Sequence, residues 1–450
     1  MSGIQLFALH SPYGLMTAVA ALDAGLLGDA AERVLVPMNT AAVPETAIDL
    51  ATAPAYTTLR GRFDRIEPLN ALIDPLHPTD WHPDEQDLPL LGRLLRRAWG
   101  LGDGEVELFV QSPQVAPART LMALFDRARL GVIGDGLMTY SPIRARLPRQ
   151  ITERVARVVY PDVVAGVEPL VFAETDALRV PVPAPAFGAV LREAGECAPD
   201  DALDALVDGG SRTALVIGQY LAALGLVSAA EERAMQMAMI DRVAGAGAER
   251  IVFKPHPAAP PSGIATLAER AADRGMAFAT FTGPQPAEYA ALRLGATDVA
   301  AAFSSALPTM RALHDARIHA VGAETMLARL TPYENSNRMP VTIVDAMTRG
   351  IGEGRMQQLV DTVGYAMQPE IVAHLRPRAV QFLASSSDAE RERYVPAGRL
   401  RALGLPGAPA PTVLQRLSPR GGVGRLEELR LTAAGARRRA GRVWKVARGR

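Results

Sequence analysis

The residue best suited to chemistry in this chain is a histidine held between two prolines. Residues 251–253 form a short apolar run that continues into Lys254, Pro255, His256 and Pro257. Each proline fixes its own φ and biases the preceding residue towards an extended conformation, so the backbone around His256 is stiff. We expect the imidazole to project from the carboxyl end of a strand, the edge of a parallel sheet where ligands bind. The alternative is a structural histidine, and the flanking prolines favour function.

A pair of serines supplies a second feature of the same kind. Residues 297–303 are strand-like, and Ser304 and Ser305 then open a helix. Serine hydroxyls, free backbone N–H groups and the positive end of a helix dipole together suit a phosphate, although simple helix capping would need the same residues. Lys254 is predicted to face the same way as His256, where it could neutralise that phosphate or lie in water. Gly218 and Pro257 complete the predicted phosphate side.

An acidic residue follows a strand in the first half of the chain. Asp135 comes directly after the strand-like residues 130–133 and has a glycine on each side. Glycines let the backbone turn sharply and keep the carboxylate uncrowded, so Asp135 could act as a general base. An ordinary turn has the same sequence. The triplet at residues 102–104 is also Gly-Asp-Gly, but it precedes a strand and therefore belongs to the opposite edge of the sheet.

Two further polar groups are weaker candidates. A cluster at residues 333–338 contains Glu334, Asn337 and Arg338, which could bind a sugar or its carboxylate or could form a hydrophilic loop. On the acceptor side, position alone selects His10, Ser11, Tyr13 and Gly136.

Composition excludes several classes of protein. The formal net charge is zero and aromatic residues make up 5% of the 450 residues, so nucleic acid is not an expected partner. The single cysteine, Cys197, rules out an internal disulfide framework and favours a reducing compartment. The amino terminus lacks the basic region of a signal peptide, and no apolar run is long enough to span a membrane. We therefore expect a cytoplasmic protein.

The neutral total conceals a basic carboxyl-terminal tail. Residues 415–450 contain eleven Lys or Arg against two Glu, a net charge of +9. Such a tail could bind anionic lipid headgroups at the inner face of a membrane, or could be a solvated extension.

Alternating strand and helix patterns predict an α/β chain with two domains built on parallel sheets. We place the first domain at residues 1–190, the second at 205–370, a helical linker segment at 371–414 and the basic tail at 415–450. Residues 181–187 are predicted to be an extended linker, 341–345 to be the last strand, and 357–374 to be a helix that packs on the first domain.

Several motifs are absent from the sequence. There is no Asp-x-Asp pair, Walker phosphate loop, His-Glu-x-x-His or Cys-x-x-Cys, so no metal site or cofactor is expected.

The order of the three motifs resembles the bacterial sialyltransferases of GT-B type, and most closely the α-2,8-polysialyltransferase-like family. Those enzymes carry an acidic-acidic-Gly motif, a His-Pro motif and a serine pair, matched here by Asp135-Gly136, His256-Pro257 and Ser304-Ser305. The chain departs from the family at the first acidic position, which is Gly134. The resemblance covers roughly residues 1–370.

The resemblance implies two doubly wound domains with a cleft between them, in which residues 1–190 bind the acceptor and residues 205–370 bind the CMP donor. It also implies transfer of a sialic acid from a CMP-activated donor to a glycan hydroxyl with inversion. Asp135 would be the general base, His256 would stabilise the departing CMP phosphate, and Ser304 and Ser305 would hold it. Because CMP leaves as a single phosphate ester, no chelating metal is required. Three alternatives remain: a CDP-glycerol or polyol-phosphate transferase, a UDP-sugar epimerase or transferase, and a non-catalytic scaffold of a surface-polysaccharide complex.

Overall fold

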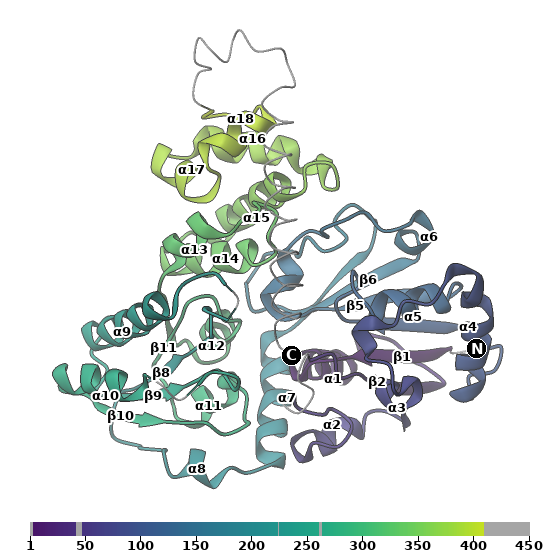
Figure 1. Cartoon of the computed structure of the whole chain (residues 1–450), viewed down its shortest axis with the longest axis horizontal. Helices are drawn as coiled ribbons and strands as arrows, with labels where there is room; N and C mark the ends of the chain where they lie inside the picture. Colours follow the sequence, from purple (N-terminus) through teal and green to yellow (C-terminus); the bar gives the residue numbers. More distant parts are fainter. Residues whose placement is uncertain (1–2, 42–46, 224, 261–262, 409–450) are drawn as a thin grey trace, which may run out of the picture.

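Two parallel β-sheets form the framework of the chain (Figure 1). The computed structural model describes residues 3–41, 47–223, 225–260 and 263–408, and the predicted basic tail lies outside these ranges. The first sheet has seven strands in the order β3-β2-β1-β4-β5-β6-β7, and the second has five in the order β10-β9-β8-β11-β12. All strand pairs are parallel, so the prediction of an α/β chain with two parallel sheets is confirmed.

The first sheet and its helices come from the first half of the sequence. Its strands are β1 (Ile4–Leu9), β2 (Glu32–Pro37), β3 (Arg65–Ile66), β4 (Val106–Val110), β5 (Arg129–Ile133), β6 (Val155–Pro161) and β7 (Leu178–Val182). Its helices are α1 (Pro12–Asp23), η2 (Pro54–Tyr56), α2 (Thr57–Arg60), α3 (Leu69–Ile73), η3 (Pro78–Asp80), η4 (Glu85–Asp87), α4 (Leu88–Ala98), α5 (Ala118–Leu124), η5 (Gly136–Tyr140) and α6 (Arg149–Thr152).

The second sheet follows after α7 (Ala184–Cys197) and α8 (Asp201–Asp204). Its strands are β8 (Thr213–Ile217), β9 (Arg250–Lys254), β10 (Ala277–Thr280), β11 (Asp298–Ala301) and β12 (Arg317–Ala320). The later helices are α9 (Ala229–Gly245), α10 (Ile264–Asp273), α11 (Ala287–Arg293), α12 (Ala306–His314), α13 (Ala323–Arg329), α14 (Arg338–Thr348), α15 (Glu353–Met367), η6 (Ala373–Leu375), α16 (Arg376–Ser385), α17 (Asp388–Tyr394) and α18 (Ala397–Leu403).

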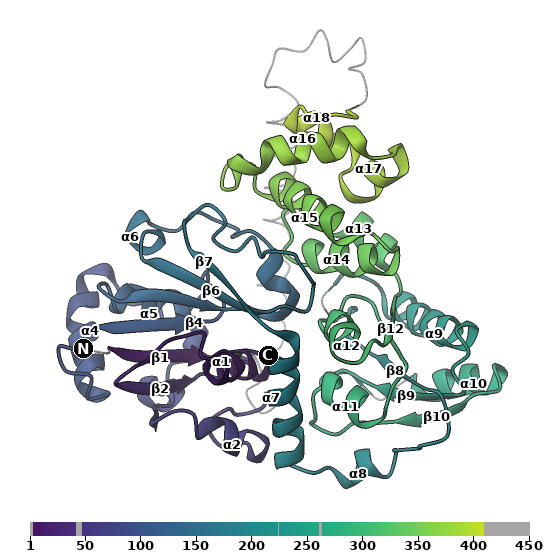
Figure 2. The same ribbon diagram turned by 180° about the vertical axis from the view of Figure 1, so that it is seen from behind.

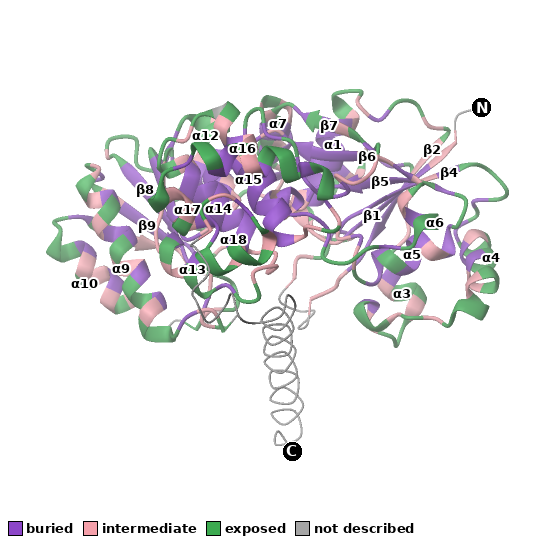
Figure 3. Cartoon of the chain, turned by 90° about the horizontal axis from the view of Figure 1, so that it is seen from above, coloured by how far each residue is buried: buried purple, intermediate pink, exposed green. Residues whose placement is uncertain are grey.

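The central strands are apolar because they are buried on both faces, and Figure 3 colours most of their residues as buried. Leu6, Phe7 and Ala8 of β1 and Leu215 and Val216 of β8 are fully buried. Burial on both faces removes the polar alternation of a half-exposed strand, and it makes these strands readable from sequence as continuous apolar runs.

Helix α7 lies between the two sheets in opposite views of the molecule (Figures 1 and 2). Two of its glycines allow close approach to the second half: a Cβ on Gly188 would lie 2.8 Å from Leu313, and one on Gly195 would lie 2.0 Å from Tyr289. The prediction of an extended linker at residues 181–187 was wrong. Pro181 and Val182 belong to edge strand β7, where a proline is tolerated, and Ala184 already begins α7.

Two other predicted elements also differ from the structure. Residues 341–345 lie inside helix α14 and are not a strand. All five are buried, so the helix shows no polar face from which its period could be read. The helix predicted over residues 357–374 ends at Met367, because Pro369 disfavours helical backbone at Gln368. Its predicted packing on the first domain is confirmed: Gln357 accepts a hydrogen bond from the Glu168 N–H at 2.6 Å.

Candidate functional site

Each sheet has a point where the strand order reverses, and some of the predicted site residues lie at these two points. In the first sheet the reversal lies between β1 and β4, and in the second between β8 and β11. Ligands of doubly wound sheets bind outside the carboxyl ends of the strands at such points. His10 follows β1, and Gly218 and Ser304 follow β8 and β11.

Asp135 lies where the sequence predicts, just past the carboxyl end of β5. Its backbone N–H donates to the Thr139 hydroxyl at 2.7 Å, which holds the turn, and Gly136 adopts a φ of +53° that favours glycine. The Ser112 hydroxyl lies 3.5 Å from Asp135 Oδ2 and 3.1 Å from His10 Nε2. Asp135 is therefore the end of a short polar chain that begins at His10.

A cavity of about 120 Å³ opens beside Asp135. Its polar lining comes from Ser112, Gln114, Asp135, Thr139, Ser141 and Arg144. Ser336, from the segment before α14, also lines it, and its carbonyl accepts a hydrogen bond from the Ser141 hydroxyl at 3.0 Å. The half-buried carboxylate of Asp135 thus faces a hollow that both halves of the chain enclose.

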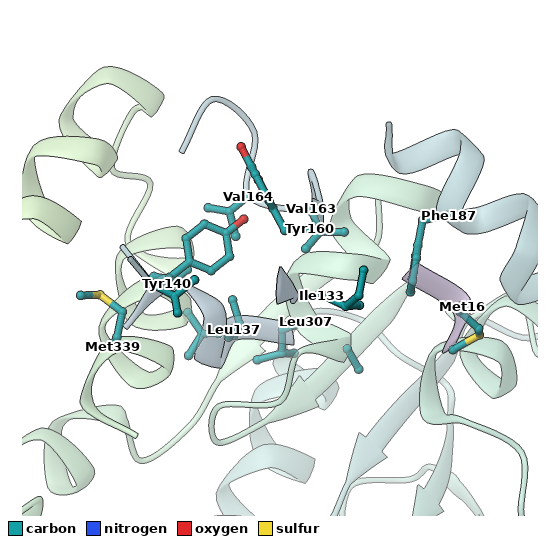
Figure 4. Packing of buried hydrophobic residues seen from close by; sticks show 14 of the residues in the cluster. Met16, Ile133, Leu137, Tyr140, Tyr160, Val163, Val164, Phe187, Leu307 and Met339 are labelled. Carbon is teal, nitrogen blue, oxygen red and sulfur yellow. The ribbon is translucent and has the colours of Figure 1, made fainter. Parts of the chain in front are cut away.

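The loop that carries Asp135 approaches the serine pair of the second half of the chain through Gly136. A Cβ built on Gly136 would lie 3.1 Å from the Cβ of Ser305 and 4.0 Å from the Tyr13 ring. The absence of a side chain at Gly136 therefore lets the loop that carries Asp135 approach the start of α12. The packing behind this contact is apolar: Leu137 of η5, Leu307 of α12 and Met339 of α14 are buried members of the hydrophobic cluster that Figure 4 shows in part.

A half-buried carboxyl group near this contact, that of Glu288, was missed by the sequence analysis. The Ser305 hydroxyl lies 3.4 Å from Glu288 Oε1, and burial raises the pKa of Glu288. The pKa of Tyr13 is also raised, by burial first and then by the Glu288 charge. In the sequence Glu288 is only an acid in the first turn of a helix, a common position, so nothing marked it as part of the site.

The serines begin α12 in the way the sequence predicts. The Ser304 hydroxyl accepts a hydrogen bond from the Ala306 N–H at 3.2 Å, while Ser305 caps no helix N–H with its side chain.

Gln219, which the sequence analysis also missed, bridges the reversal point of the second sheet. Its Oε1 accepts from the N–H groups of Ala302 and Phe303 at 2.8 and 2.9 Å. This bridge fixes the turn that precedes the serine pair.

His256 follows β9, as predicted, and faces a different hollow. A cavity of about 40 Å³ is lined by His256, Gly218, Tyr220 and Pro255 among others, and it shares no lining residue with the cavity beside Asp135. His256 Nδ1 accepts a hydrogen bond from the Ala258 N–H at 3.1 Å, so the neutral ring carries its proton on Nε2. Burial lowers the pKa of His256, and the charge of Glu232 opposes this.

The structure separates some residues that the sequence grouped. Because β9 and β11 lie on either side of β8, His256 and Ser304 are about two strand spacings apart, roughly 10 Å. Lys254 does not share the partners of His256. Its Nζ donates to the Gly283 carbonyl at 2.7 Å and lies 4.5 Å from the centre of the Phe281 ring. Burial lowers the pKa of Lys254 to about 8, against the charges of Asp200 and Glu288.

The cluster at residues 333–338 has structural contacts. All three guanidinium nitrogens of Arg338 donate to backbone carbonyls, those of Tyr333, Leu327 and Leu330, and the residue is 2% exposed. Glu334 forms an ion pair with Arg399 at 2.7 Å. The Asn337 backbone N–H bonds to the Asn335 side chain. Of the remaining candidates, Ser11 caps α1 by accepting from the Gly14 N–H, and Pro257 is exposed beside His256.

Neither a metal-binding cluster nor a membrane span is found in the described ranges. No three His, Cys, Asp or Glu side chains of these residues converge in a way that could hold a metal ion. Among the helices that the structure describes, none is long and apolar enough to cross a bilayer.

Two doubly wound sheets with polar residues at facing strand ends define the two-domain α/β architecture of GT-B type. Residues 5–317 match the family described as alpha-2,8-polysialyltransferase (POLYST). The chain belongs to this family and is a glycosyltransferase. The search of curated proteins found no match.

Solved structures with similar folds were found at low identity. A glycosyltransferase from Rickettsia africae is 8% identical, with a TM-score of 0.38 over 86% of this chain and 100% of that chain. A UDP-glucosyltransferase from Polygonum tinctorium is 13% identical, with a TM-score of 0.40 over 86% and 100%. The UDP-N-acetylglucosamine 2-epimerase from Rickettsia bellii is 10% identical, with a TM-score of 0.39 over 88% and 99%.

Proposed function

We propose that the chain transfers a sialic acid from a CMP-activated donor to a glycan hydroxyl with inversion at the anomeric carbon. The observation that carries this proposal is the close approach of Gly136, next to Asp135, to Ser305 at the start of α12. It brings a carboxylate from one sheet next to a serine pair from the other. A base on one side and a phosphate-binding helix start on the other are what glycosyl transfer from a nucleotide donor requires.

In this mechanism the acceptor occupies the cavity beside Asp135. One carboxylate oxygen of Asp135 takes the proton of the acceptor hydroxyl as its oxygen bonds to the anomeric carbon. The bond between that carbon and the CMP phosphate oxygen breaks on the opposite face, and its electron pair stays with the phosphate. The charge that develops in the sugar ring is that of an oxocarbenium-like transition state.

The donor phosphate lies along the carboxyl edge of the second sheet. Ser304, Ser305 and the first N–H groups of α12 bind its oxygens, and His256 donates a hydrogen bond from Nε2 to the oxygen that gains charge. The lowered pKa of His256 favours the neutral imidazole. The neutral ring suffices for this role, because its Nε2–H needs only to donate a hydrogen bond. The strand ends before His256 and Ser304 lie about 10 Å apart, a span that the two side chains and one phosphate can bridge. We assign the cytidine and ribose to the same edge of the second sheet.

Donor and metal requirement are tested together. Purified protein is incubated with CMP-sialic acid, CDP-glycerol or UDP-sugars, with and without EDTA, and nucleotide release is measured. Release of CMP from CMP-sialic acid alone, undiminished by EDTA, is the expected result. If only CDP-glycerol or only a UDP-sugar is turned over, that compound is the donor and CMP-sialic acid is not. If no donor is turned over, the result favours a non-catalytic scaffold.

The two proposed catalytic residues have matched controls within the chain. Asp135→Asn should lower transfer at least about a hundredfold, the contribution of a general base. Asp103→Asn, in the other Gly-Asp-Gly triplet, should leave transfer unchanged. His256→Ala should lower transfer to a similar degree, whereas the exposed His82→Ala should not. All four variants should keep the wild-type melting temperature within a few degrees, and full activity in either site variant removes that residue from the mechanism.

Membrane attachment through the basic tail is a separate part of the proposal. The charge of +9 in residues 415–450 supports binding to anionic headgroups at the inner face of a cell membrane. Deletion of residues 415–450 should reduce sedimentation with anionic vesicles, and unchanged sedimentation would exclude the tail as a tether.

A further inference from the structure

The hydroxyl of Ser305 has one hydrogen to donate, and the structure directs it to a carboxyl group. Its Oγ lies 3.4 Å from Glu288 Oε1. Ser305 caps no helix N–H with its side chain, whereas the Ser304 hydroxyl is bonded to the Ala306 N–H. A carboxylate can only accept hydrogen bonds, so an ionised Glu288 takes the single hydrogen of Ser305. That hydrogen is the one that Ser305 needs in order to donate to a phosphate.

The position of Glu288 beside the serine pair is fixed by the packing of α11. Helices α11 and α12 contact each other and α7, as Figures 1 and 2 show from opposite sides. Just before α11, the buried Gln285 donates from Nε2 to the Ala198 carbonyl. Just after Glu288, Tyr289 lies against Gly195 of α7, where a Cβ would come within 2.0 Å of the tyrosine ring. Glu288 is therefore held from both sides within reach of the serine pair.

Titratable groups from several other elements face Glu288. They are Lys254 at the end of β9, Tyr13 of α1 and Tyr56 of η2. Burial and the charge of Glu288 raise the pKa of both tyrosines, and the charge of Asp135 also raises that of Tyr13. The charged side chains of the neighbouring helices α7 and α12 are exposed or paired elsewhere: Arg192, Glu193, Glu196, Arg311 and His314.

Lys254 does not hold Glu288 in its ionised form. Its Nζ donates to the Gly283 carbonyl at 2.7 Å and forms no ion pair with Glu288. Burial raises the pKa of Glu288, and this effect exceeds the opposing effects of the Ser305 hydrogen bond and the Lys254 charge. The half-buried carboxyl group is thus able to take up a proton when another negative charge comes near.

A donor phosphate is such a charge. In the proposed function it binds at Ser304, Ser305 and the first N–H groups of α12, so it comes to lie beside Glu288. A like charge in this position disfavours the ionised carboxylate. Once protonated, Glu288 can donate its O–H to Ser305 Oγ, and the Ser305 hydrogen is then free for a phosphate oxygen. An ionised Glu288 would instead leave Ser305 facing the phosphate with its lone pairs.

We infer that binding of a nucleotide phosphate at the serine pair is coupled to the uptake of one proton by Glu288, which turns the Ser305 hydroxyl from Glu288 towards the phosphate. The proton comes from solvent and returns to it when the nucleotide leaves, so no bond of donor or acceptor forms or breaks at Glu288. Glu288 is a positioning residue, since it acts through Ser305. The turned hydroxyl faces the phosphate group that gains charge during transfer, where a preoriented donor is most effective. The inference rests on the proposed function, because it requires a phosphate at the serine pair.

Calorimetry measures this proton directly. Full-length protein is titrated with the methyl ester of cytidine 5′-monophosphate, because the ester lacks the second phosphate ionisation near about pH 6 and releases no proton itself. The binding enthalpy is recorded between about pH 5 and about pH 8 in buffers of different ionisation enthalpy, and the slope gives the number of protons taken up. Glu288→Gln should take up fewer protons than the wild type, by up to about one. Glu269→Gln, exposed on α10, is the matched control and should take up as many as the wild type. Uptake that remains in Glu288→Gln is assigned to His256 and Lys254.

The dissociation constant gives a second readout. In the wild type it should rise with pH, by at most about tenfold per pH unit for one proton. Glutamine resembles the protonated acid, because its amide can donate to Ser305 at any pH. Glu288→Gln should therefore show a weaker rise and should bind the ester more tightly than the wild type at about pH 8. If Glu288 itself contacts the ligand, the variant will bind more weakly at every pH, and that result would overturn the inference.

The serine pair supplies a further comparison. Ser305→Ala removes the hydroxyl that joins Glu288 to the phosphate, so its proton uptake should be smaller than that of the wild type. Ser304→Ala removes a hydroxyl bonded to the Ala306 N–H, and it should bind more weakly but keep the uptake. Equal uptake by the wild type, Glu288→Gln and Ser305→Ala contradicts the inference. If the wild type does not bind the ester at all, the proposed donor is wrong and the inference fails with it, so the two failures are distinguishable.

Discussion

Substitution of Gly136 by alanine tests whether the approach of the two sheets matters for transfer. Gly136 has a φ of +53°, and an alanine at such an angle costs about 1–2 kcal/mol of folding free energy. The added Cβ would also lie 3.1 Å from the Ser305 Cβ, whereas carbon atoms normally pack at about 3.5–4.0 Å. Either the Asp135 loop or the start of α12 must therefore move by a few tenths of an ångström.

A movement of this size would displace Asp135 or the serine pair, the groups that we propose act on the acceptor and on the donor phosphate. Misplacement of catalytic groups by about 1 Å can cost about a hundredfold in rate, so for a shift of a few tenths of an ångström we expect Gly136→Ala to lower kcat/KM about 3- to 10-fold. Gly102→Ala is the matched control. Gly102 has a φ of +56°, and a Cβ there would have no other atom within 4 Å. It therefore carries the same backbone cost without the contact.

Two assays separate the backbone cost from the effect of the contact. Urea unfolding should show a loss of about 1–2 kcal/mol in both variants, because both place alanine at a positive φ. CMP release from CMP-sialic acid in the presence of acceptor should fall only in Gly136→Ala. Equal activity of the two variants would refute the reasoning, since the approach of Gly136 to Ser305 would then have no part in catalysis.

Three further substitutions probe the groups around this contact. Lys254 is one of only two lysines in the chain, and its pKa of about 8 lies below the unfolded value of 10.5. At a pH between these values, Lys254 is protonated in the unfolded chain and not in the folded chain. The free energy of unfolding should therefore rise with pH from about 8 to about 10.5. In urea titrations, Lys254→Met should abolish that rise. The pH dependence expected from Glu288 has the opposite sign, because its pKa is raised and the folded chain keeps the proton to a higher pH than the unfolded chain. The free energy of unfolding should therefore fall as the pH rises above 4.5. Glu288→Gln should show a smaller fall over the same range. Ser304→Ala with Ser305→Ala should raise the KM for CMP-sialic acid about tenfold or more with no comparable change in the KM for acceptor, and an unchanged donor KM would exclude the pair from phosphate binding.

Much of the fold can be predicted from the sequence, because the central strands are buried on both faces and therefore consist of continuous apolar residues. Residues 130–133 and 251–253 are recognisable in this way, and β5 and β9 include them. Asp135 and His256 then follow directly, since each stands just after such a run. Because ligands bind at the strand ends of a parallel sheet, the amino-acid pattern alone selects both residues as candidates for the site.

The parts of the site and fold that were not predicted depend on packing between segments far apart in the sequence, and a local sequence pattern does not indicate such packing. Glu288 becomes a site residue only because α11 packs close to Ser305, and its sequence environment is that of any helix start. Arg338 looks like a free cation until three carbonyls surround it. The sequence predicts a strand within helix α14 because burial on all sides hides the period of the helix.

The contact between η5 and α14 limits how this enzyme could be recombined with its relatives. The two helices are in contact although they belong to opposite halves of the sequence. Leu137 and Tyr140 of η5 and Met339 of α14 are buried in the cluster that Figure 4 shows. A hybrid made by joining two parental genes at α7 would separate these partners and set a foreign helix against the loop that carries Asp135. Donor preference is therefore more safely exchanged through an internal cassette that ends before Arg338, so that α14 is inherited from the same parent as η5.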